Sequence, residues 1–343
     1  MAEIIVEKEW TKEPAGRRIF GNFIESGFGR QVNGMWSEML YNRAFREVPA
    51  IKIATWEWLG LDKEHYNSNA PFWHSGYEEN DWEVIGAPEQ EHTCGTHTYK
   101  GMTSLLLKNT DGSECGLSQK GLHLQKGKRY QFRIFAGVRG DMSEAGLNGF
   151  GDTIHSEKAE LLTVKIGTQE TSFALTTVPR LFTWEWEEAC GGTAQIRLTF
   201  SFPGTLVLSF ASLMPADNLG GWRADVVEKL KEAAPSVVRF PGGCFVSFYN
   251  WESSIGDRDR REPQPSFYWG GLEENDVGLD EFLQLSQLVG FEPQLCFNMM
   301  TSEPFKARQM VEYLNAPENV GMGRLRMQNG HKEPYGVRLF EMD

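Results

Sequence analysis

The spacing of apolar residues changes near Pro215, and this change constrains the fold more than any other feature of the chain. Between about residues 80 and 214, apolar side chains recur at every second position, which is typical of strands with one buried face. Several such strands, separated by glycine-rich turns, predict an antiparallel β-sandwich. The clearest runs are Tyr130, Phe132, Ile134, Ala136 and Val138, and then Ala194, Ile196, Leu198, Phe200 and Phe202.

After Pro215 the pattern alternates between helices and buried strands. Apolar residues at helical spacing predict one helix that stops at Pro235, a second from Leu279 to Gly290, and a third that begins beside Pro304. Continuous apolar runs predict buried strands at 237–240, 294–298 and 337–342. Helices and strands in this alternation predict a parallel sheet.

The sequence before the predicted sandwich belongs with the parallel sheet. Residues 18–24 predict a strand and residues 36–45 a helix, so the sandwich is an insertion. We therefore expect three stretches: 1–53 with the first β/α unit, 54–214 as the inserted β-sandwich, and 215–343 with strands two to four. The expected fold class is α/β plus all-β, and because no flexible linker is visible the two parts should pack together.

The composition excludes some partners. Acidic residues outnumber Lys and Arg by 47 to 34, and this net charge of −13 opposes binding to nucleic acid or to an anionic membrane. The charge does not repel a neutral polysaccharide, and 11 Trp and 22 Phe provide flat rings for stacking on sugars. The five cysteines form no CxxC pair and the seven histidines no HExxH motif, so we expect neither a metal nor a cofactor.

The start of the chain predicts a location. It has no basic segment followed by an apolar one, and no later stretch approaches the length of a membrane span. We expect a soluble protein, cytoplasmic as written, or secreted or periplasmic if a signal peptide was replaced.

Candidate site residues follow from the parallel sheet, because the segments after the C-terminal ends of its strands usually carry the chemistry. This rule selects Glu25, the run Arg239–Cys244 and Asn298. Glu25 is expected to accept sugar hydroxyls, or else to pair with Arg18 or Arg43. Arg239 is expected to hold a site carboxylate ionised, or else to form a structural ion pair. Cys244 is expected to be an inert buried thiol and not a nucleophile, because no histidine lies near it in sequence.

Five aromatic residues are candidates for stacking against sugar rings: Trp251, Tyr268, Trp269, Trp56 and Trp58. The first three belong to the long segment after the second strand, and the last two lie near the start of the predicted sandwich. A role at a domain interface is the alternative for Trp56 and Trp58. These rings are also compatible with a chain that only binds glycans and is not an enzyme.

Five segments, in this order, resemble glycoside hydrolase family 51, the α-L-arabinofuranosidases, especially the branch with an inserted carbohydrate-binding-like sandwich. The resemblance implies a (β/α)8 barrel, of which this chain holds the first half. It also implies that Glu25, Arg239, Cys244 and Asn298 line the pocket for a terminal arabinofuranose. The segments that carry it are Ile19–Glu25, Gly34–Phe45, Val238–Val246, Trp251–Glu252 with Ile255–Arg261, and Asn275–Leu283.

The resemblance implies a retaining hydrolase that removes terminal α-L-arabinofuranosyl groups from arabinoxylan or arabinan, polysaccharides of the plant cell wall, or from their oligosaccharides. Its acid/base Glu is expected just after Asp343 and its nucleophile after the seventh strand, and Glu341 lies inside the fourth strand and is no substitute. Retaining enzymes need two carboxyl groups about 5 Å apart. The chain alone is therefore expected to be inactive, with the rest of the barrel in a longer or second chain. An endoglucanase of the same family and a glycan-binding module are the alternatives.

Overall fold

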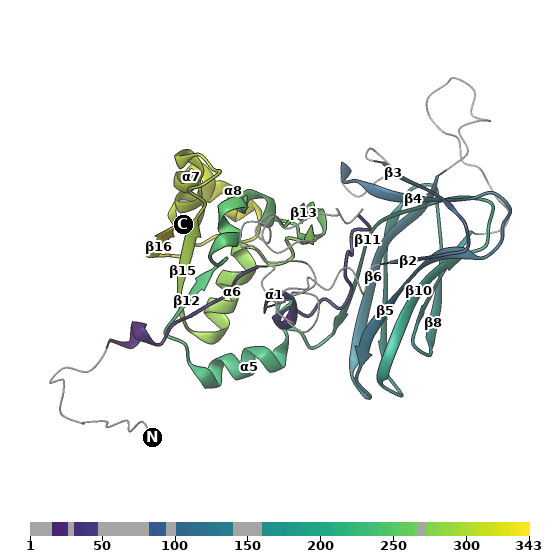
Figure 1. Cartoon of the computed structure of the whole chain (residues 1–343), viewed down its shortest axis with the longest axis horizontal. Coiled ribbons are helices and arrows are strands. Elements are labelled where there is room, and N and C mark those ends of the chain that lie inside the picture. Colours follow the sequence, from purple (N-terminus) through teal and green to yellow (C-terminus); the bar gives the residue numbers. More distant parts are fainter. Residues whose placement is uncertain (1–15, 27–30, 47–81, 94–100, 140–159, 267–271) are drawn as a thin grey trace, which may run out of the picture.

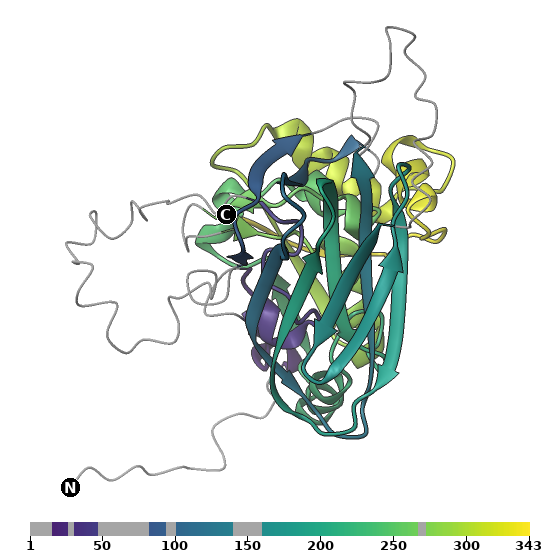
Figure 2. The ribbon, with the colours of Figure 1, turned by 90° about the vertical axis from the view of Figure 1, so that its right-hand side faces the viewer.

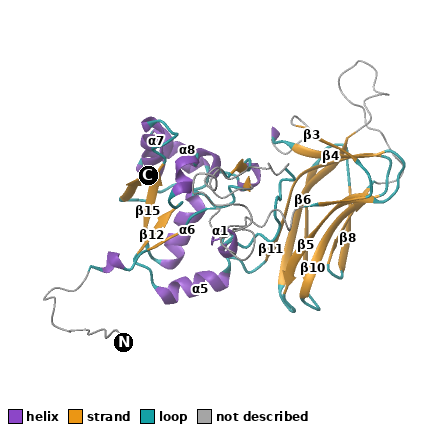
Figure 3. Cartoon of the chain, viewed as in Figure 1, coloured by secondary structure: helices purple, strands orange, loops and turns teal. Residues whose placement is uncertain are grey.

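The protein is described here by a computed structural model that covers residues 16–26, 31–46, 82–93, 101–139, 160–266 and 272–343. Its described elements form a mixed α/β structure with one parallel sheet and two larger antiparallel sheets. Helices gather around the parallel sheet, and the antiparallel sheets stand beside it (Figures 1 and 3). Figure 2, turned by 90°, gives the same arrangement, with the antiparallel strands in front of the helices.

The parallel sheet contains β1 (Asn22–Phe23), β12 (Val237–Phe240), β15 (Glu292–Phe297) and β16 (Leu339–Met342), in that spatial order. All three neighbouring pairs are parallel, with Phe23 opposite Arg239 and Arg239 opposite Gln294. The C-terminal ends of the four strands therefore lie at one edge of the sheet. The sequence predicted the three later strands closely, whereas the predicted first strand begins with a short 3-10 helix, η1 (Arg17–Ile19).

The helices beside this sheet are α5 (Ala224–Ala233), α6 (Leu279–Val289), α7 (Pro304–Asn315) and α8 (Gly321–Gln328). Their ends follow local rules. Pro304 occupies the first turn of α7, where a missing N–H costs nothing. Gly290 ends α6 with a φ of 94°, a left-handed conformation that glycine adopts without strain. The first three of these helices were predicted from the sequence, and α8 was not.

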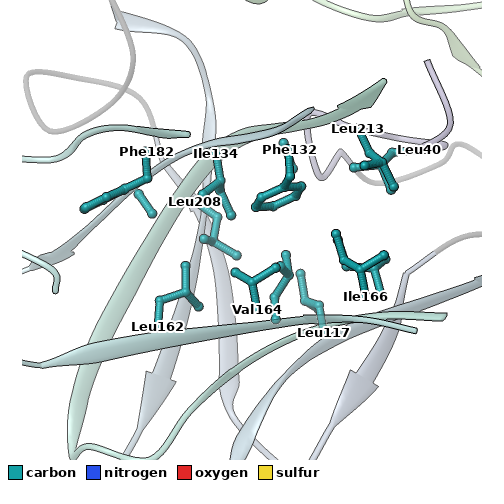
Figure 4. Close-up of a cluster of buried hydrophobic side chains, with 14 of the residues drawn as sticks. Leu40, Leu117, Phe132, Ile134, Leu162, Val164, Ile166, Phe182, Leu208 and Leu213 are labelled. Carbon is teal, nitrogen blue, oxygen red and sulfur yellow. The ribbon is translucent and has the colours of Figure 1, made fainter. Parts of the chain in front are cut away.

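Each antiparallel sheet has five strands, and the two sheets enclose one hydrophobic core. On β6, four of the five side chains predicted to face inward, Tyr130, Phe132, Ile134 and Ala136, are buried, and the fifth, Val138, is half-buried, which confirms the period-two pattern. Figure 4 shows side chains of β6, β9 and β11 meeting those of β5 and β7. The first sheet orders β2 (Glu83–Ile85), β5 (Cys115–Leu124), β10 (Gly192–Phe200), β7 (Leu161–Ile166) and β8 (Gln169–Ala174), and the second orders β3 (Glu89–Thr93), β4 (Ser104–Asn109), β11 (Gly204–Pro215), β6 (Arg129–Arg139) and β9 (Arg180–Glu187).

The antiparallel sheets lie, in sequence, between two neighbouring strands of the parallel sheet, because β1 pairs directly with β12. This order agrees with the interpretation of the sheets as an insertion. The predicted boundary at residues 53 and 54 lies outside the described residues, so the division at 53 and 214 stays a prediction.

The predicted helix at residues 36–45 is wrong. Helix α1 (Gln31–Met35) ends before this segment, and Asn42 and Phe45 have positive φ angles of 47° and 55°. The backbone instead pairs with β11 and its surroundings: Met39 N–H donates to the Leu213 carbonyl, and Arg43 O accepts from Ala211 N–H. These long-range bonds use the backbone groups that a helix would pair internally.

A buried ionic network joins this segment to both parts of the molecule. Arg43 Nε donates to Asp276 Oδ1 at 2.7 Å, just before α6, and Arg43 Nη1 donates to Asp259 Oδ1 at 3.1 Å. The second oxygen of Asp259 pairs with Arg133 of β6. Asp259 lies on the 3-10 helix η5 (Arg258–Arg260), so its two oxygens connect the antiparallel sheet to the segment that follows β12.

Glu38 extends the network to β11. Its Oε1 accepts from Leu213 N–H at 2.8 Å, its Oε2 accepts from Ser212 Oγ at 2.6 Å, and Arg258 Nη1 lies 3.8 Å from Oε2. Burial raises the pKa of Glu38, whereas Arg43 and Arg258 outweigh burial at Asp276 and hold its pKa below the usual range. The three carboxylates of the network face three arginines, so the buried charges balance.

We predict that Asp276→Asn lowers the free energy of unfolding by about 3 kcal/mol, because Arg43 would keep its charge in a buried site without a full partner. The matched control is Asp225→Asn, which removes the same charge from the exposed Arg223–Asp225 pair and should cost at most about 1 kcal/mol. Urea denaturation followed by tryptophan fluorescence measures both values. Equal effects of the two substitutions would contradict the importance of the network.

Candidate functional site

The candidate site lies at the edge of the parallel sheet where all four strands end. Ile24 N–H donates to the Arg239 carbonyl at 2.8 Å, and Ser26 N–H donates to the Pro241 carbonyl at 3.1 Å, so the chain after β1 runs beside the chain after β12. After β15 and β16, Asp343 N–H donates to the Phe297 carbonyl at 3.2 Å. The structure thus gathers the three strand ends that the sequence analysis selected, together with the end of β16.

Glu25 is buried between these segments. Its Oε1 accepts from Phe245 N–H at 3.1 Å, and its own N–H donates to Gln31 Oε1 at 2.9 Å. The expected alternative partners do not hold it: Arg18 pairs with Glu292, and Arg43 belongs to the buried network. A carboxylate held by a backbone N–H in this way is positioned to accept further hydrogen bonds from a ligand.

Gly242 is what lets Glu25 and the turn after β12 approach each other. Its φ is 111°, and a Cβ at this position would stand 2.3 Å from both Cβ and Cγ of Glu25. At Gly243 a Cβ would lie 3.4 Å from Arg239 Nη2 and 3.6 Å from Glu25 Oε2. The guanidinium and the carboxylate therefore reach the same side of the paired glycines, beside the cis Phe240–Pro241 bond.

Arg239 makes the ion pair that the sequence analysis gave as its alternative role, with Glu341, a partner that the analysis did not name. Its Nη1 donates to Glu341 Oε1 at 2.8 Å, and its guanidinium lies over the Phe23 ring, 5.4 Å from the ring centroid. Gln294 Nε2 donates to the other Glu341 oxygen at 2.9 Å. The sequence did contain a signal for this pair. Arg239 and Glu341 carry opposite charges on strands that were predicted to be buried, and buried charges are usually paired.

Cys244 begins the 3-10 helix η3 (Cys244–Phe248) and its side chain is exposed. Partial desolvation, followed by the nearby charges of Glu25 and Asp343, raises the pKa of its thiol. The thiolate is the nucleophilic form of cysteine, so a raised pKa argues against a nucleophile here. The expected burial of Cys244 is therefore wrong, because the residue lies at the exposed start of η3, and its lack of reactivity stays a prediction.

Asn298 shapes the turn after β15. Its Oδ1 accepts from Thr301 N–H at 2.9 Å, and its Nδ2 donates to the Tyr249 carbonyl at 3.2 Å. The same turn is tied to η3 by Thr301 Oγ1, which donates to the Ser247 carbonyl. The amide of Asn298 thus holds the turn after β15 against the segment after β12.

The aromatic candidates separate into two groups. Trp251, on the 3-10 helix η4 (Trp251–Ser254), is buried, its ring lies 5.6 Å from that of Tyr313, and its Nε1 donates to the Lys306 carbonyl. Such burial gives Trp251 a role in the core in place of the predicted stacking on sugar. Tyr268, Trp269, Trp56 and Trp58 lie outside the described residues.

In the described ranges the structure assembles no group of three His, Cys, Asp or Glu side chains suited to a metal ion. None of the helices described there is long and apolar enough to cross a membrane.

Comparison with known proteins identifies the segment that carries most of this site. The family described as "Alpha-L-arabinofuranosidase 1 domain" matches residues 229–343, which include β12, β15 and β16. Residues 229–343 are thus similar to α-L-arabinofuranosidases, among them enzymes of glycoside hydrolase family 51. This arabinofuranosidase segment contains Arg239, Cys244 and Asn298, whereas Glu25 precedes it.

Individual relatives match a similar length of chain. α-L-Arabinofuranosidase C of Emericella nidulans is 40% identical over 128 residues, which are 37% of this chain and 25% of the relative. The intracellular exo-α-(1→5)-L-arabinofuranosidase of Streptomyces lividans is 36% identical over 135 residues, 38% of this chain and 20% of the relative. The chain thus spans about a quarter or less of the length of the curated relatives it matches.

Among solved structures, the α-L-arabinofuranosidase of Thermotoga maritima in complex with arabinose is 38% identical. The match covers 35% of this chain and 25% of that one, with a TM-score of 0.35. The family 51 α-L-arabinofuranosidase of Thermotoga petrophila is 37% identical over 36% of this chain and 26% of that one, also with a TM-score of 0.35.

One carboxyl in the segment between β12 and α6 has a raised pKa. Glu273 ends β14 (Leu272–Glu273), which pairs with β13 (Gln264–Pro265) in the segment between β12 and α6. Desolvation raises its pKa to about 8, although its Oε1 accepts from Asn275 N–H, and the neighbouring charges of Glu274 and Asp276 add to the rise. The folded protein therefore holds a proton on Glu273 that the unfolded chain loses above its ordinary pKa.

We predict that this proton makes stability depend on pH. Because the folded pKa is raised, the contribution of Glu273 to stability is complete below about pH 4.5 and is lost as the pH rises through about 8. Glu273→Gln carries no titrating proton. Between pH 5 and pH 9 the free energy of unfolding of the wild type should therefore fall relative to that of the variant. Chemical denaturation across this range measures the difference, and a constant difference would contradict the raised pKa.

Proposed function

We propose that the intact protein is a retaining glycoside hydrolase that removes terminal α-L-arabinofuranosyl residues from arabinoxylan or arabinan. The observation that carries the proposal is the match of residues 229–343 to the arabinofuranosidase family, in the same segment that places Arg239 and Cys244 beside Glu25. The names of the relatives agree with this activity. Neutral plant cell-wall polysaccharides or oligosaccharides would be the partners, and the net charge of −13 does not repel them.

We further propose that β1, β12, β15 and β16 are the first four strands of a (β/α)8 barrel. Their sequential, all-parallel order supports this architecture. So do the exposed apolar side chains at both outer strands, Phe20 and Phe23 at β1 and Met342 on β16. In this proposal the remaining strands, in a longer or second chain, cover those edges, and residues 54–214 are an inserted sandwich of the carbohydrate-binding type.

In this proposal each residue of the pocket has its own role. Glu25 accepts hydrogen bonds from sugar hydroxyls, Arg239 donates to the sugar or to a site carboxylate, and Cys244 and Asn298 shape the rim. The acid/base and the nucleophile, about 5 Å apart in a retaining enzyme, are assigned by the family resemblance to positions after the fourth and seventh strands. Residues 1–343 would then bind the terminal sugar without cleaving it.

A panel of aryl glycosides tests the activity. The intact protein should release the aryl group from the α-L-arabinofuranoside with retention of the anomeric configuration, followed by NMR, while residues 1–343 alone should release none. Activity on aryl β-glucosides or cellulose, without any on the arabinofuranoside, would overturn the proposal in favour of an endoglucanase. Retardation on arabinoxylan gels without any hydrolysis by the intact protein would favour a binding module.

We predict that Glu25→Gln in the intact protein lowers kcat/KM for the aryl arabinofuranoside by about 10- to 100-fold. The reason is that a hydrogen bond to a charged group is worth about 1.5 to 3 kcal/mol. Glutamine keeps an oxygen for Phe245 N–H, so the melting temperature should change little. Glu292→Gln, at the opposite end of β15, is the matched control and should leave kcat/KM unchanged. Equal effects of the two changes would contradict the binding role of Glu25.

A further inference from the structure

The face of the parallel sheet that carries Arg239 holds a row of interacting side chains that no part of the proposed function assigns. Strands in a sheet are about 4.8 Å apart, so a side chain that reaches the second strand over must cross the one between. Arg239 on β12 does so, because it contacts Glu341 on β16 although β15 lies between them. Gln294 of β15 occupies the place between and donates to the same carboxylate.

Glu341 is held on both of its oxygens. Oε1 accepts from Arg239 Nη1 at 2.8 Å, and Oε2 accepts from Gln294 Nε2 at 2.9 Å, with Cys296 Sγ 3.9 Å away. Burial and then the charge of Glu341 raise the pKa of Cys296 to about 12, so the thiol beside the carboxylate stays neutral. Both oxygens of Glu341 are therefore engaged in placing its neighbours.

Arg239, in turn, is held on two sides and keeps donors for a ligand. The Phe23 ring lies on one side of its guanidinium and Glu341 binds Nη1 on the other, so little rotational freedom remains. Nη2 is directed toward Gly243 and Glu25, and within the described part of the chain the buried Nε has no hydrogen-bond partner. Arginine has five N–H donors, and this arrangement leaves those nearest Glu25 available.

We propose that Glu341, supported by Gln294, is a positioning residue that aims the free N–H donors of Arg239 at the sugar bound beside Glu25. The inference rests on the proposed function, because it concerns the same pocket. Glu341 acts through Arg239 and does not touch the sugar. It also balances the charge of Arg239, so that the pocket binds a neutral sugar without an unpaired cation.

A double-mutant cycle in the intact protein tests this role with an aryl α-L-arabinofuranoside. Glu341→Ala should raise KM about tenfold with kcat changed less than about threefold, because a ground-state binding donor is misplaced. Arg239→Met should raise KM further. The double variant should match Arg239→Met alone, because Glu341 has no other route to the substrate. Glu341→Gln, which keeps the shape of the side chain, should give an intermediate KM.

The matched control is the same cycle on Arg18 and Glu292, an ion pair at the opposite end of the same sheet, which should leave KM unchanged. Additive effects of Glu341→Ala and Arg239→Met on KM, or a wild-type KM in Glu341→Ala, would overturn the inference while the proposed function stands. If Glu341→Ala does not fold, Glu341→Gln with Arg239→Met decides by the same criterion.

Failure of the proposed function would look different. In that case the wild-type protein would leave the arabinofuranoside intact and hydrolyse another glycoside of the panel. The cycle would then be measured on that glycoside, where coupling between Glu341 and Arg239 supports the positioning role and additivity overturns it.

Discussion

The buried network around Asp259 is the interaction on which the rest of the structure depends. One carboxylate receives Arg133 from the antiparallel sheet and Arg43 from the segment that follows α1. Because Asp259 belongs to the same segment as Cys244, this contact also fixes the chain that forms one wall of the candidate site. Desolvating so many charges is costly, and the network is tolerable only because every carboxylate has a close cation.

A second constraint acts at the strand ends, where the backbone and not a side chain decides the geometry. The approach of Glu25 to Gly242 leaves no room for a Cβ, and the carboxylate receives an N–H from the following turn. The guanidinium of Arg239, from β12, lies on the same side of Gly243 as the carboxylate of Glu25. The arrangement of the candidate site is thus set by the parallel sheet, and the segments after β12 and β15 are tied to each other beside it.

Much of the fold could be predicted because its signals are local. The periods of two and 3.6, Pro304 at the start of α7 and Gly290 at the end of α6 act within a few residues. The segment 36–45 was mispredicted because its backbone forms hydrogen bonds with β11, far away in sequence, although its apolar residues have helical spacing. The partnership of Arg239 with Glu341 was missed because the predicted strand order makes β15, and not β16, the neighbour of β12, and only the side-chain geometry shows that Arg239 reaches across β15. Burial of Trp251 likewise depends on Tyr313, 62 positions later in the chain.

The network between the two parts of the molecule has a consequence for ionic strength. Dissolved ions weaken exposed pairs such as Arg197–Glu114 and Lys120–Glu83, because they enter the water between the charges. They cannot enter the space between Arg43 and Asp276, whose side chains are almost fully covered. The antiparallel sheets should therefore keep one fixed orientation toward the parallel sheet in dilute buffer and in concentrated salt alike.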